Sequence, residues 1–391
     1  MYYNRLKYTG LKSSVGFLLL VLYLVVMSSS CKDETDIKDA DELALESLNL
    51  PDEPANYSSP FLPSFFYNQF VTIQDNTPSD NPTTDWGATL GRVLFYDKML
   101  SINNTVSCAS CHQQEFGFID TARFSKGFDG ELTRRHSMAL ANSAYYINGR
   151  FFWDERAASL EEQVLEPIED KIEMGMTLPA VIERLNAVDY YPVLFKKAFN
   201  DEEITEDRIA KALAQFVRSM VSYTSKYDMG RALVNDRKTP FPNFTNAENR
   251  GKNIFMTHRT VNCFGCHNTD VFITDHPRNN GLAVDDQDEG IYIHTLNNRD
   301  KGKFKTPSLK NVAVRGRFMH DGSLSSLEEV IEHYNSGIQA HPNLDSHLID
   351  VSTGIPVQMN LTPQDKADII AFLHTLTDHD LLTDEKFSNP F

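Results

Sequence analysis

Two short stretches of this 391-residue chain repeat one arrangement of side chains, and they limit the fold more than any other feature. In each stretch two cysteines stand three positions apart, and a histidine directly follows the second. The residues are Cys108, Cys111 and His112 in SCASCHQQ, and Cys263, Cys266 and His267 in NCFGCHNT. Such side chains can form a disulfide, hold a zinc ion or attach a cofactor covalently.

The trailing histidine helps to choose among these three chemistries. A disulfide does not require it, and adjacent Cys and His side chains are awkwardly placed for one tetrahedral zinc ion. C-x-x-C-H is the signature of c-type haem attachment, in which each thiol adds across a haem vinyl group and the histidine becomes the proximal iron ligand. Because the two motifs use every cysteine except Cys31, the sequence predicts two covalently bound haems c.

The N-terminal thirty residues have the pattern of an export signal. Arg5, Lys7 and Lys12 precede a 13-residue apolar run, which is shorter than the roughly 20 residues of a spanning helix. Small residues, SSS, stand directly before Cys31, as in the lipobox of a bacterial lipoprotein. We therefore predict a signal peptide over 1–30, lipidation of Cys31, and an exported protein anchored in the outer membrane that faces the periplasm or the cell surface. A plain secretory signal is the alternative.

Composition sets further limits. Hydrophobic residues make up 41% of the chain, as is typical of a soluble globular protein. The net charge of −17 would not neutralise phosphates, so nucleic acid is not expected as a partner. Residues 31–60 are acidic, contain three prolines and show no sustained apolar period. They predict a solvated tether.

The sequence on either side of the two motifs also repeats. GRVLF (91–95) precedes the first motif and GKNIF (251–255) precedes the second. Behind each motif follows an apolar stripe at helical spacing, over 205–220 and 362–376. The second of these segments begins TPQD, with a threonine N-cap, a proline at N1 and an aspartate at N3.

The spacing of these repeats indicates two copies of one domain. His112 lies 104 residues before Phe216, and His267 lies 105 residues before Phe372. We therefore expect two mostly helical haem domains, at 61–238 and 239–391. Their boundary is placed in the stretch NDRKTPFPNFTNAE.

With these features the chain resembles the bacterial di-haem cytochrome c peroxidase family, including its MauG-like branch. The resemblance covers roughly residues 60–380 and rests on the two haem motifs, on FFWDERAASLEEQVLEPIEDKIEM and on FKTPSLKNVAVRGRFMHDGSLSSLEEVIEHYNSG. It implies a mainly α fold of two cytochrome-c-like haem domains packed face to face, with a C-terminal helix closing the second. It also implies that the first haem reacts with peroxide and that the second relays electrons.

The resemblance assigns roles to several side chains. Trp153 matches the tryptophan between the haems, and Gln163 and Glu173 match the polar pair above the peroxide-binding iron, with Pro167 beside them. A carboxylate there can remove one proton from peroxide and deliver one to the departing oxygen, whereas glutamine only orients it. From the residues alone, a core aromatic and a solvated helix carboxylate are the alternatives for Trp153 and Glu173.

Three features of the sequence depart from the family pattern. Glu155 stands where a glycine is usual. His136 replaces an asparagine that helps to hold calcium, and Arg315 and Arg317 flank the segment whose carbonyls would complete that site; these surroundings argue against calcium. His136 could instead ligate a haem or be hydrogen-bonded within the fold. No other histidine lies between His112 and His136, so the ligand that blocks the first haem in typical members is missing.

The distal ligand of the second haem is the last position that the resemblance assigns. Tyr334 lies fourteen residues after His320 of the HDG motif, where peroxidases with a high-potential second haem have methionine and the MauG branch has tyrosine. The resemblance therefore implies His267 and Tyr334 as ligands. Met319 is the competing ligand by residue type.

Three functions follow from these features. The first is a peroxidase that reduces hydrogen peroxide to water with electrons from a small cytochrome c or another redox protein. The second is a MauG-like oxidase that modifies residues of a partner protein through a bis-ferryl state. The third is a non-enzymatic di-haem electron carrier, for which Gln163 and Glu173 over an open iron would have no use.

Overall fold

The computed structural model of the chain describes residues 39–258, 263–274, 276–285 and 287–391. The predicted signal peptide and Cys31 lie outside the described residues. Residues 44–391 form one compact unit, and the described residues 39–43 belong to a separate one. Within the described ranges no helix has both the length and the apolar character needed to cross a membrane.

The predicted mainly α fold is confirmed, since backbone pairing in the described residues is limited to isolated bridges. The α-helices are α2 (Ala40–Leu45), α3 (Gln69–Thr72), α4 (Asp85–Tyr96), α5 (Cys108–Cys111), α6 (Leu160–Gln163), α7 (Glu166–Glu169), α8 (Leu178–Asn186), α9 (Tyr190–Phe199), α10 (Glu206–Ser219), α11 (Lys226–Arg231), α12 (Asn246–Thr257), α13 (Cys263–Cys266), α14 (Tyr292–Thr295), α15 (Leu327–Glu332), α16 (Pro363–His374) and α17 (His379–Thr383). The short 3₁₀ turns are η1 (Ser64–Tyr67), η2 (Lys98–Leu100), η3 (Gln114–Phe116), η4 (Asn298–Asp300), η5 (Val312–Val314), η7 (Ser346–Leu348) and η8 (Glu385–Phe387), and η6 (His333–Gly337) is a π-helical turn.

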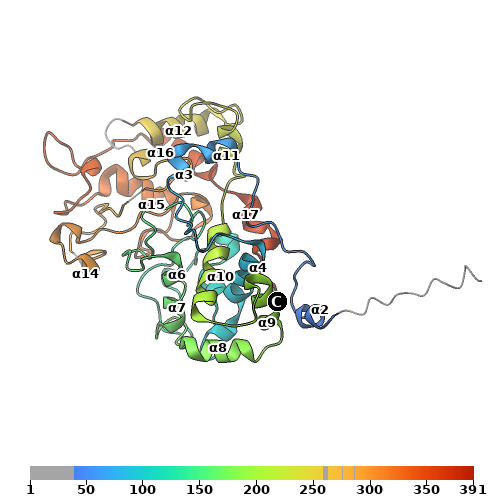
Figure 1. Cartoon of the computed structure of the whole chain (residues 1–391). Coiled ribbons are helices and arrows are strands. Elements are labelled where there is room, and N and C mark those ends of the chain that lie inside the picture. Colours follow the sequence, from blue (N-terminus) through green and yellow to red (C-terminus); the bar gives the residue numbers. More distant parts are fainter. Residues whose placement is uncertain (1–38, 259–262, 275, 286) are drawn as a thin grey trace, which may run out of the picture. The chain divides into compact units, whose positions relative to one another are not determined.

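Two closely packed helix pairs, α4 with α10 and α12 with α16, lie next to the two predicted haem motifs (Figure 1). Each pair brings a glycine against the partner backbone. A Cβ atom on Gly91 would lie 2.0 Å from the Ala212 carbonyl oxygen, and one on Gly251 would lie 1.8 Å from that of Asp368. Only glycine permits so close an approach, which explains why both sequence repeats begin with it.

The C-terminal helix α16 begins as its sequence predicts. The Thr362 hydroxyl accepts a hydrogen bond from the Asp365 backbone N–H at 3.1 Å, and the Asp365 carboxylate accepts one from the Thr362 N–H at 3.0 Å. This reciprocal cap satisfies two backbone donors that a helix start leaves free. The apolar face of α16 then packs into the same core as α12.

After α16 the chain returns to the hydrophobic core of its first half, which is called the first core below. Leu381 and Phe387 are buried among residues that otherwise come from the first half of the chain. The tail is fixed by its backbone carbonyls, because Tyr96 donates its hydroxyl to the Phe387 carbonyl at 2.7 Å and Arg92 donates to that of Ser388 at 2.6 Å. The last residues therefore tie the end of the chain to α4.

Part of the segment expected as a solvated tether is packed as well. Leu48 and Tyr57 are buried in the first core. The backbone N–H groups of Tyr57 and Ser58 both donate to the Asp85 carboxylate at 2.8 Å. An apolar period is absent from this segment because single side chains, rather than a helical face, provide its contacts.

Two loops of equal length meet where the halves of the chain face each other. Residues 151–157 and 318–324 are each closed by one antiparallel pair between their end residues. The His136 N–H donates to the His320 carbonyl at 2.9 Å, and the Lys305 N–H donates to the Trp153 carbonyl at 2.8 Å. These reciprocal bonds cross between the two halves and place Trp153 and His320 side by side.

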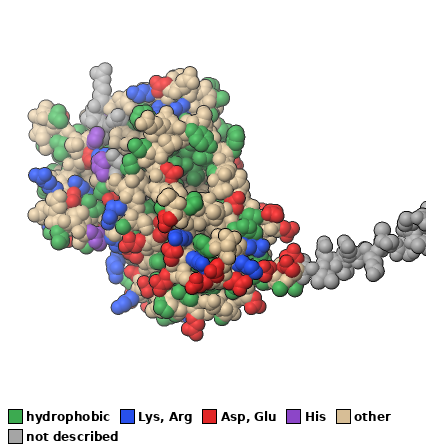
Figure 2. Space-filling model, viewed as in Figure 1, with side chains coloured by type: hydrophobic (Ala, Val, Ile, Leu, Met, Phe, Trp, Pro, Cys, Tyr) green, Lys and Arg blue, Asp and Glu red, His purple; other side chains and the backbone are tan. Residues whose placement is uncertain are grey.

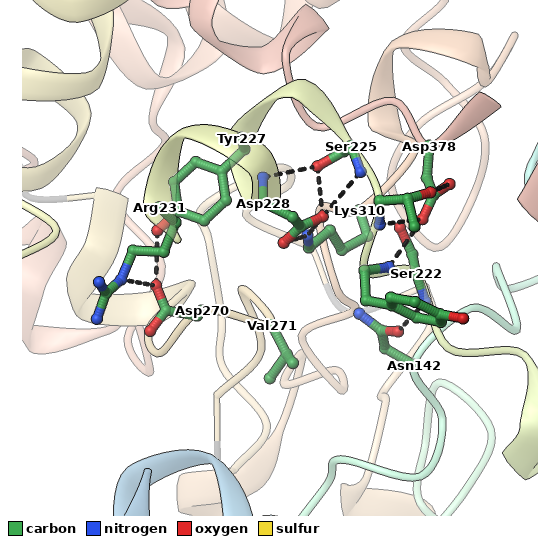
Figure 3. Close-up of polar contacts among 12 residues, drawn as sticks. Asn142, Ser222, Ser225, Tyr227, Asp228, Arg231, Asp270, Val271, Lys310 and Asp378 are labelled. Carbon is green, nitrogen blue, oxygen red and sulfur yellow. Dashed lines mark hydrogen bonds and ion pairs between the residues drawn. The ribbon is translucent and has the colours of Figure 1, made fainter. Parts of the chain in front are cut away.

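A buried polar network connects α11 to the second half (Figure 3). The Lys310 ammonium contacts both oxygens of the Asp228 carboxylate at 2.5 Å, and neither side chain is exposed by more than 1%. The Ser225 hydroxyl donates to the same carboxylate at 2.5 Å. The neighbouring Asp270 accepts from the Tyr227 hydroxyl at 2.8 Å. Each charge in this region therefore has an opposite charge or a hydrogen-bond donor beside it.

We expect Asp228→Ala to lower the free energy of unfolding by about 3–5 kcal/mol, because it leaves the Lys310 ammonium buried without its counter-charge. Denaturant unfolding of the holoprotein measures this loss. Asp201→Ala removes an exposed carboxylate from a surface ion pair with Arg208 and should change stability little. Equal losses in the two variants would contradict the assignment.

Candidate functional sites: two haem attachment sites

The first attachment motif forms a single helical turn. Cys108 and Cys111 stand at the two ends of α5 and are not paired in a disulfide. The backbone N–H of the N-cap residue Ser107 donates to the Ser110 hydroxyl at 3.0 Å. His112 follows directly and places its Nδ1 atom 3.0 Å from the Phe118 carbonyl oxygen. Nδ1 must therefore carry the proton, which leaves a lone pair on Nε2 for a metal.

A cavity of about 640 Å³ lies against this turn. Its wall brings together residues that the sequence placed far apart, namely His112, Gln163, Pro167 and Glu173. A smaller space of about 60 Å³ is lined by the same four residues together with Cys108 and apolar side chains of α4 and α10. The predicted polar pair and the predicted proximal histidine therefore share one site, and its size is in the range of cofactor pockets.

Glu173 lies in the loop that follows α7. Burial, and secondly the nearby Asp170 carboxylate, raise the pKa of Glu173 to about 7. The Asp170 carboxylate also accepts a hydrogen bond from the Glu173 backbone N–H at 3.2 Å. A carboxyl group with this pKa can both accept and donate a proton near neutral pH.

The second motif has the same local form. α13 spans Cys263 to Cys266, both free thiols, and the His267 N–H donates to the Cys263 carbonyl at 2.9 Å. Burial lowers the pKa of His267 to about 4, so its ring is neutral. Its Nδ1 atom is buried without a hydrogen-bond partner in the described part of the chain. A neutral imidazole beside two cysteines that are not paired in a disulfide fits a c-type haem.

Tyr334 and Met319 both line the second cavity, which has a volume of about 180 Å³ and also contains His267. Tyr334 is placed by the π-helical turn η6, which widens the end of α15; such turns are frequent at functional sites. The Met319 sulfur accepts a hydrogen bond from the Asn280 amide at 3.3 Å. The Asn280 side chain also hydrogen-bonds the Tyr334 hydroxyl. The structure thus brings both candidate ligands to the site, beside the same asparagine.

Trp153 lines both cavities. Its indole N–H donates to the His136 carbonyl at 2.7 Å, and its ring centroid lies 6.5 Å from that of His320. His320 stacks on Phe304 with centroids 3.6 Å apart. The sequence predicted the position of Trp153 but not this aromatic row, although Phe304 and His320 lie in the segments FKTP and HDG that carry the resemblance.

The residues between the cavities do not fit a calcium ion. The buried Arg315 guanidinium donates to the carbonyls of Ser308 at 2.9 Å and Lys310 at 2.6 Å, so these oxygens already face a cation. His136 is also buried here and turns Nδ1 toward the Arg123 carbonyl at 3.2 Å. Calcium prefers several carboxylate and carbonyl oxygens, and a guanidinium repels it.

Two attachment turns, each on the wall of its own cavity, define a di-haem c-type protein. A family model described as di-haem cytochrome c peroxidase matches residues 86–236. The methylamine utilization protein MauG of Methylorubrum extorquens is 35% identical over 306 residues, or 76% of this chain and 80% of that protein. The cytochrome c551 peroxidase of Nitrosomonas europaea is 29% identical, over 74% of this chain and 79% of that protein.

A solved structure of a MauG-like protein is similar to this chain in both fold and sequence. The crystal structure of a MauG-like protein associated with microbial copper homeostasis superposes with a TM-score of 0.68 at 34% identity, over 81% of this chain and 96% of that one. The chain belongs to the di-haem cytochrome c peroxidase family. It is an oxidoreductase whose cofactors are two c-type haems.

Covalent attachment gives a direct prediction for the second motif. Replacing both Cys263 and Cys266 with alanine should leave one haem per chain after denaturation, because the thioether bonds of the first motif persist. Haem staining of denaturing gels and the pyridine haemochrome assay measure this number. Release of both haems from the denatured wild type would reject c-type attachment.

Proposed function

We propose that this protein reduces hydrogen peroxide to water at the first site with electrons from a small cytochrome c or another redox protein. The observation that carries the proposal is Glu173, whose pKa lies near neutrality in the cavity that also holds Gln163 and His112. Each turnover consumes one peroxide, two electrons and two protons and yields two waters. The bound haem supplies the iron that takes up peroxide and transfers the electrons.

In this proposal Glu173 moves the proton. Its carboxylate would accept a proton from one oxygen of peroxide and return that proton to the other oxygen, which would leave as water. Transfer by one positioned group avoids free hydroxide as the leaving group. Gln163 donates a hydrogen bond that orients the peroxide, since an amide does not exchange protons at neutral pH.

The second site is proposed to relay electrons. Cys263 and Cys266 would attach its haem, with His267 and Tyr334 as the iron ligands. Trp153, in the wall of both cavities, offers an aromatic path between them. We assign the two sites to domains at 61–238 and 239–391.

A protein donor with a basic surface suits this chain. Figure 2 shows many Asp and Glu side chains, with some Lys and Arg among them, on the lower part of the viewed face, where α8 and α9 lie in Figure 1. Such an acidic face would steer a basic donor and lose that effect as salt is added.

The export pattern of residues 1–31 supports a protein anchored in the outer membrane through lipid on Cys31, and fractionation of cells tests this location.

A second function is favoured by Tyr334. Tyrosine in the second cavity, together with the 35% identity to a MauG protein, supports oxidation of residues on a partner protein. The deciding experiment mixes the holoprotein with hydrogen peroxide and reduced cytochrome c. Rapid, stoichiometric oxidation of the cytochrome supports the peroxidase. Slow oxidation, with an oxidised protein that persists for minutes, supports the MauG-like alternative.

A further inference from the structure

A buried cluster of three polar side chains lies beside Trp153, outside the catalytic residues described above. The Tyr146 hydroxyl donates a hydrogen bond to the Glu155 carboxylate. Lys305 places its ammonium 3.5 Å from the centroid of the Tyr146 ring and donates to the Arg150 carbonyl at 2.7 Å. Tyr146 is 0% exposed, Lys305 6% and Glu155 8%, so water does not stabilise these charges.

Glu155 occupies a backbone position that favours glycine. It is the fifth residue of the loop 151–157 and has φ 56°. The fifth residue of the matching loop 318–324 is Gly322, with φ 61°. A residue with a side chain is strained in this left-handed region, whereas glycine is not. The first loop therefore bears both backbone strain and a buried carboxylate, which indicates that the Glu155 side chain is needed there.

Lys305 connects the cluster to the haem sites. Its side chain lines both cavities, and its backbone N–H donates to the Trp153 carbonyl at 2.8 Å. Its ammonium also lies 4.3 Å from the centroid of Phe151, which lines the first cavity. Lys305 thus contacts the Tyr146 ring with its ammonium and Trp153 with its backbone.

We propose that Tyr146 is a redox-active tyrosine that stores one oxidising equivalent, with Glu155 as the base that receives its proton. The inference rests on the proposed peroxidase activity, because peroxide is the oxidant. One electron leaves the Tyr146 phenol by way of Trp153 and fills one of the two electron deficits that peroxide reduction creates. The phenolic O–H bond breaks, and its proton moves to the Glu155 carboxylate. The products are a neutral tyrosyl radical and a protonated Glu155.

The geometry favours this step over simple loss of an electron. A protonated tyrosine radical would carry a positive charge in a buried site that screens charge poorly. Transfer of the proton to Glu155 leaves the radical neutral. Burial raises the pKa of Glu155, and the neighbouring Lys305 opposes that rise, which keeps the carboxylate available as a base. The complete burial of Tyr146 then shields the radical from solvent and from other molecules.

Electron paramagnetic resonance of the peroxide-treated holoprotein tests the inference. The protein is made with ring-deuterated tyrosine, mixed with hydrogen peroxide in the absence of a donor, and frozen rapidly. We expect an organic radical whose hyperfine splitting collapses on deuteration. Tyr146→Phe should abolish it. Glu155→Gln, which keeps a polar group but no base, should also abolish it.

Two further variants are controls for folding defects. Glu155→Gly removes the base and relieves the backbone strain, but it also takes the neighbouring carboxylate away from the buried Lys305. Its haem content is therefore compared with that of the wild type first, and the folded variant should still lack the radical. Tyr145→Phe changes an adjacent buried tyrosine that packs on Phe66 and should keep it. A radical that survives in Tyr146→Phe, or at full strength in both Glu155 variants, would overturn the inference.

The same samples separate this inference from the proposed function. If the wild type oxidises reduced cytochrome c with peroxide but forms no tyrosyl radical when the donor is absent, the role of Tyr146 alone is wrong. If the wild type does not react with peroxide at all, the proposed peroxidase activity and the role of Tyr146 are both wrong.

Discussion

Glu173→Ala should slow the reaction with hydrogen peroxide by about 10²–10⁴-fold, the usual contribution of a positioned general acid–base group. Glu173 contributes a carboxyl to the wall of the first cavity and, in our proposal, does not ligate the iron. The absorption spectra of both haems should therefore remain close to those of the wild type. Stopped-flow measurement of the second-order rate constant with peroxide gives the effect directly.

Two matched variants sharpen the assignment of Glu173. Gln163→Ala should slow the reaction less, because the amide only orients the peroxide. Glu173→Gln keeps the shape and the hydrogen bonding of the side chain but cannot exchange a proton, so it should be nearly as slow as alanine. Wild-type turnover by Glu173→Gln would mean that another group moves the proton.

The raised pKa of Glu173 determines how the rate constant with peroxide depends on pH. Because burial raises the pKa of Glu173 to about 7, the carboxylate that accepts the first proton is present mainly above pH 7. The rate constant with peroxide should therefore rise as pH increases through about 7, and this rise should be absent in Glu173→Gln.

The raised pKa also means that the folded protein binds this proton more tightly than the unfolded chain. Glu173 thus stabilises the fold at low pH, and this contribution is lost as pH rises toward 7.

Local sequence signals predicted much of the haem framework. The two C-x-x-C-H motifs form helical turns, and the stripe ending at Met220 is buried along α10. Gly91 and Gly251 lie where the helices of each pair meet. These features depend on residues close together in the chain, and their spacing therefore reveals them. The assignment of Gln163 and Glu173 to one cavity with His112 needed the family resemblance, since no local pattern links them.

Other features depend on contacts between distant segments. Leu381 and Phe387 enter the first core as single side chains without helical periodicity, so the return of the tail was not predictable. The π-helical turn at Tyr334 has no simple sequence signal. The sequence marks Glu155 only as a replacement for glycine. Its contact with Tyr146 joins residues whose pairing has no local sequence pattern.

Tyr334→Met should raise the reduction potential of the second haem by on the order of hundreds of millivolts, since axial ligands set haem potentials over a range of about 0.8 V. A thioether favours ferrous iron, whereas an anionic phenolate favours ferric iron. A haem held by His267 and Tyr334 should therefore be low in potential and difficult for ordinary cytochromes to reduce. The methionine variant should accept their electrons and oxidise reduced cytochrome c faster in the presence of peroxide.

A spectroelectrochemical titration of the wild type and Tyr334→Met measures the shift, and Met319→Leu is the matched control. Met319 lines the same cavity, but its sulfur accepts a hydrogen bond from Asn280, so its loss should leave the potential almost unchanged if Tyr334 is the ligand. The first haem should keep its potential in both variants, because Tyr334 does not line the first cavity. If the second haem of the wild type has a high reduction potential, and if that potential falls in Met319→Leu, then Met319 and not Tyr334 is the iron ligand. That outcome would also remove the structural reason for a MauG-like reaction and leave the peroxidase as the function of this chain.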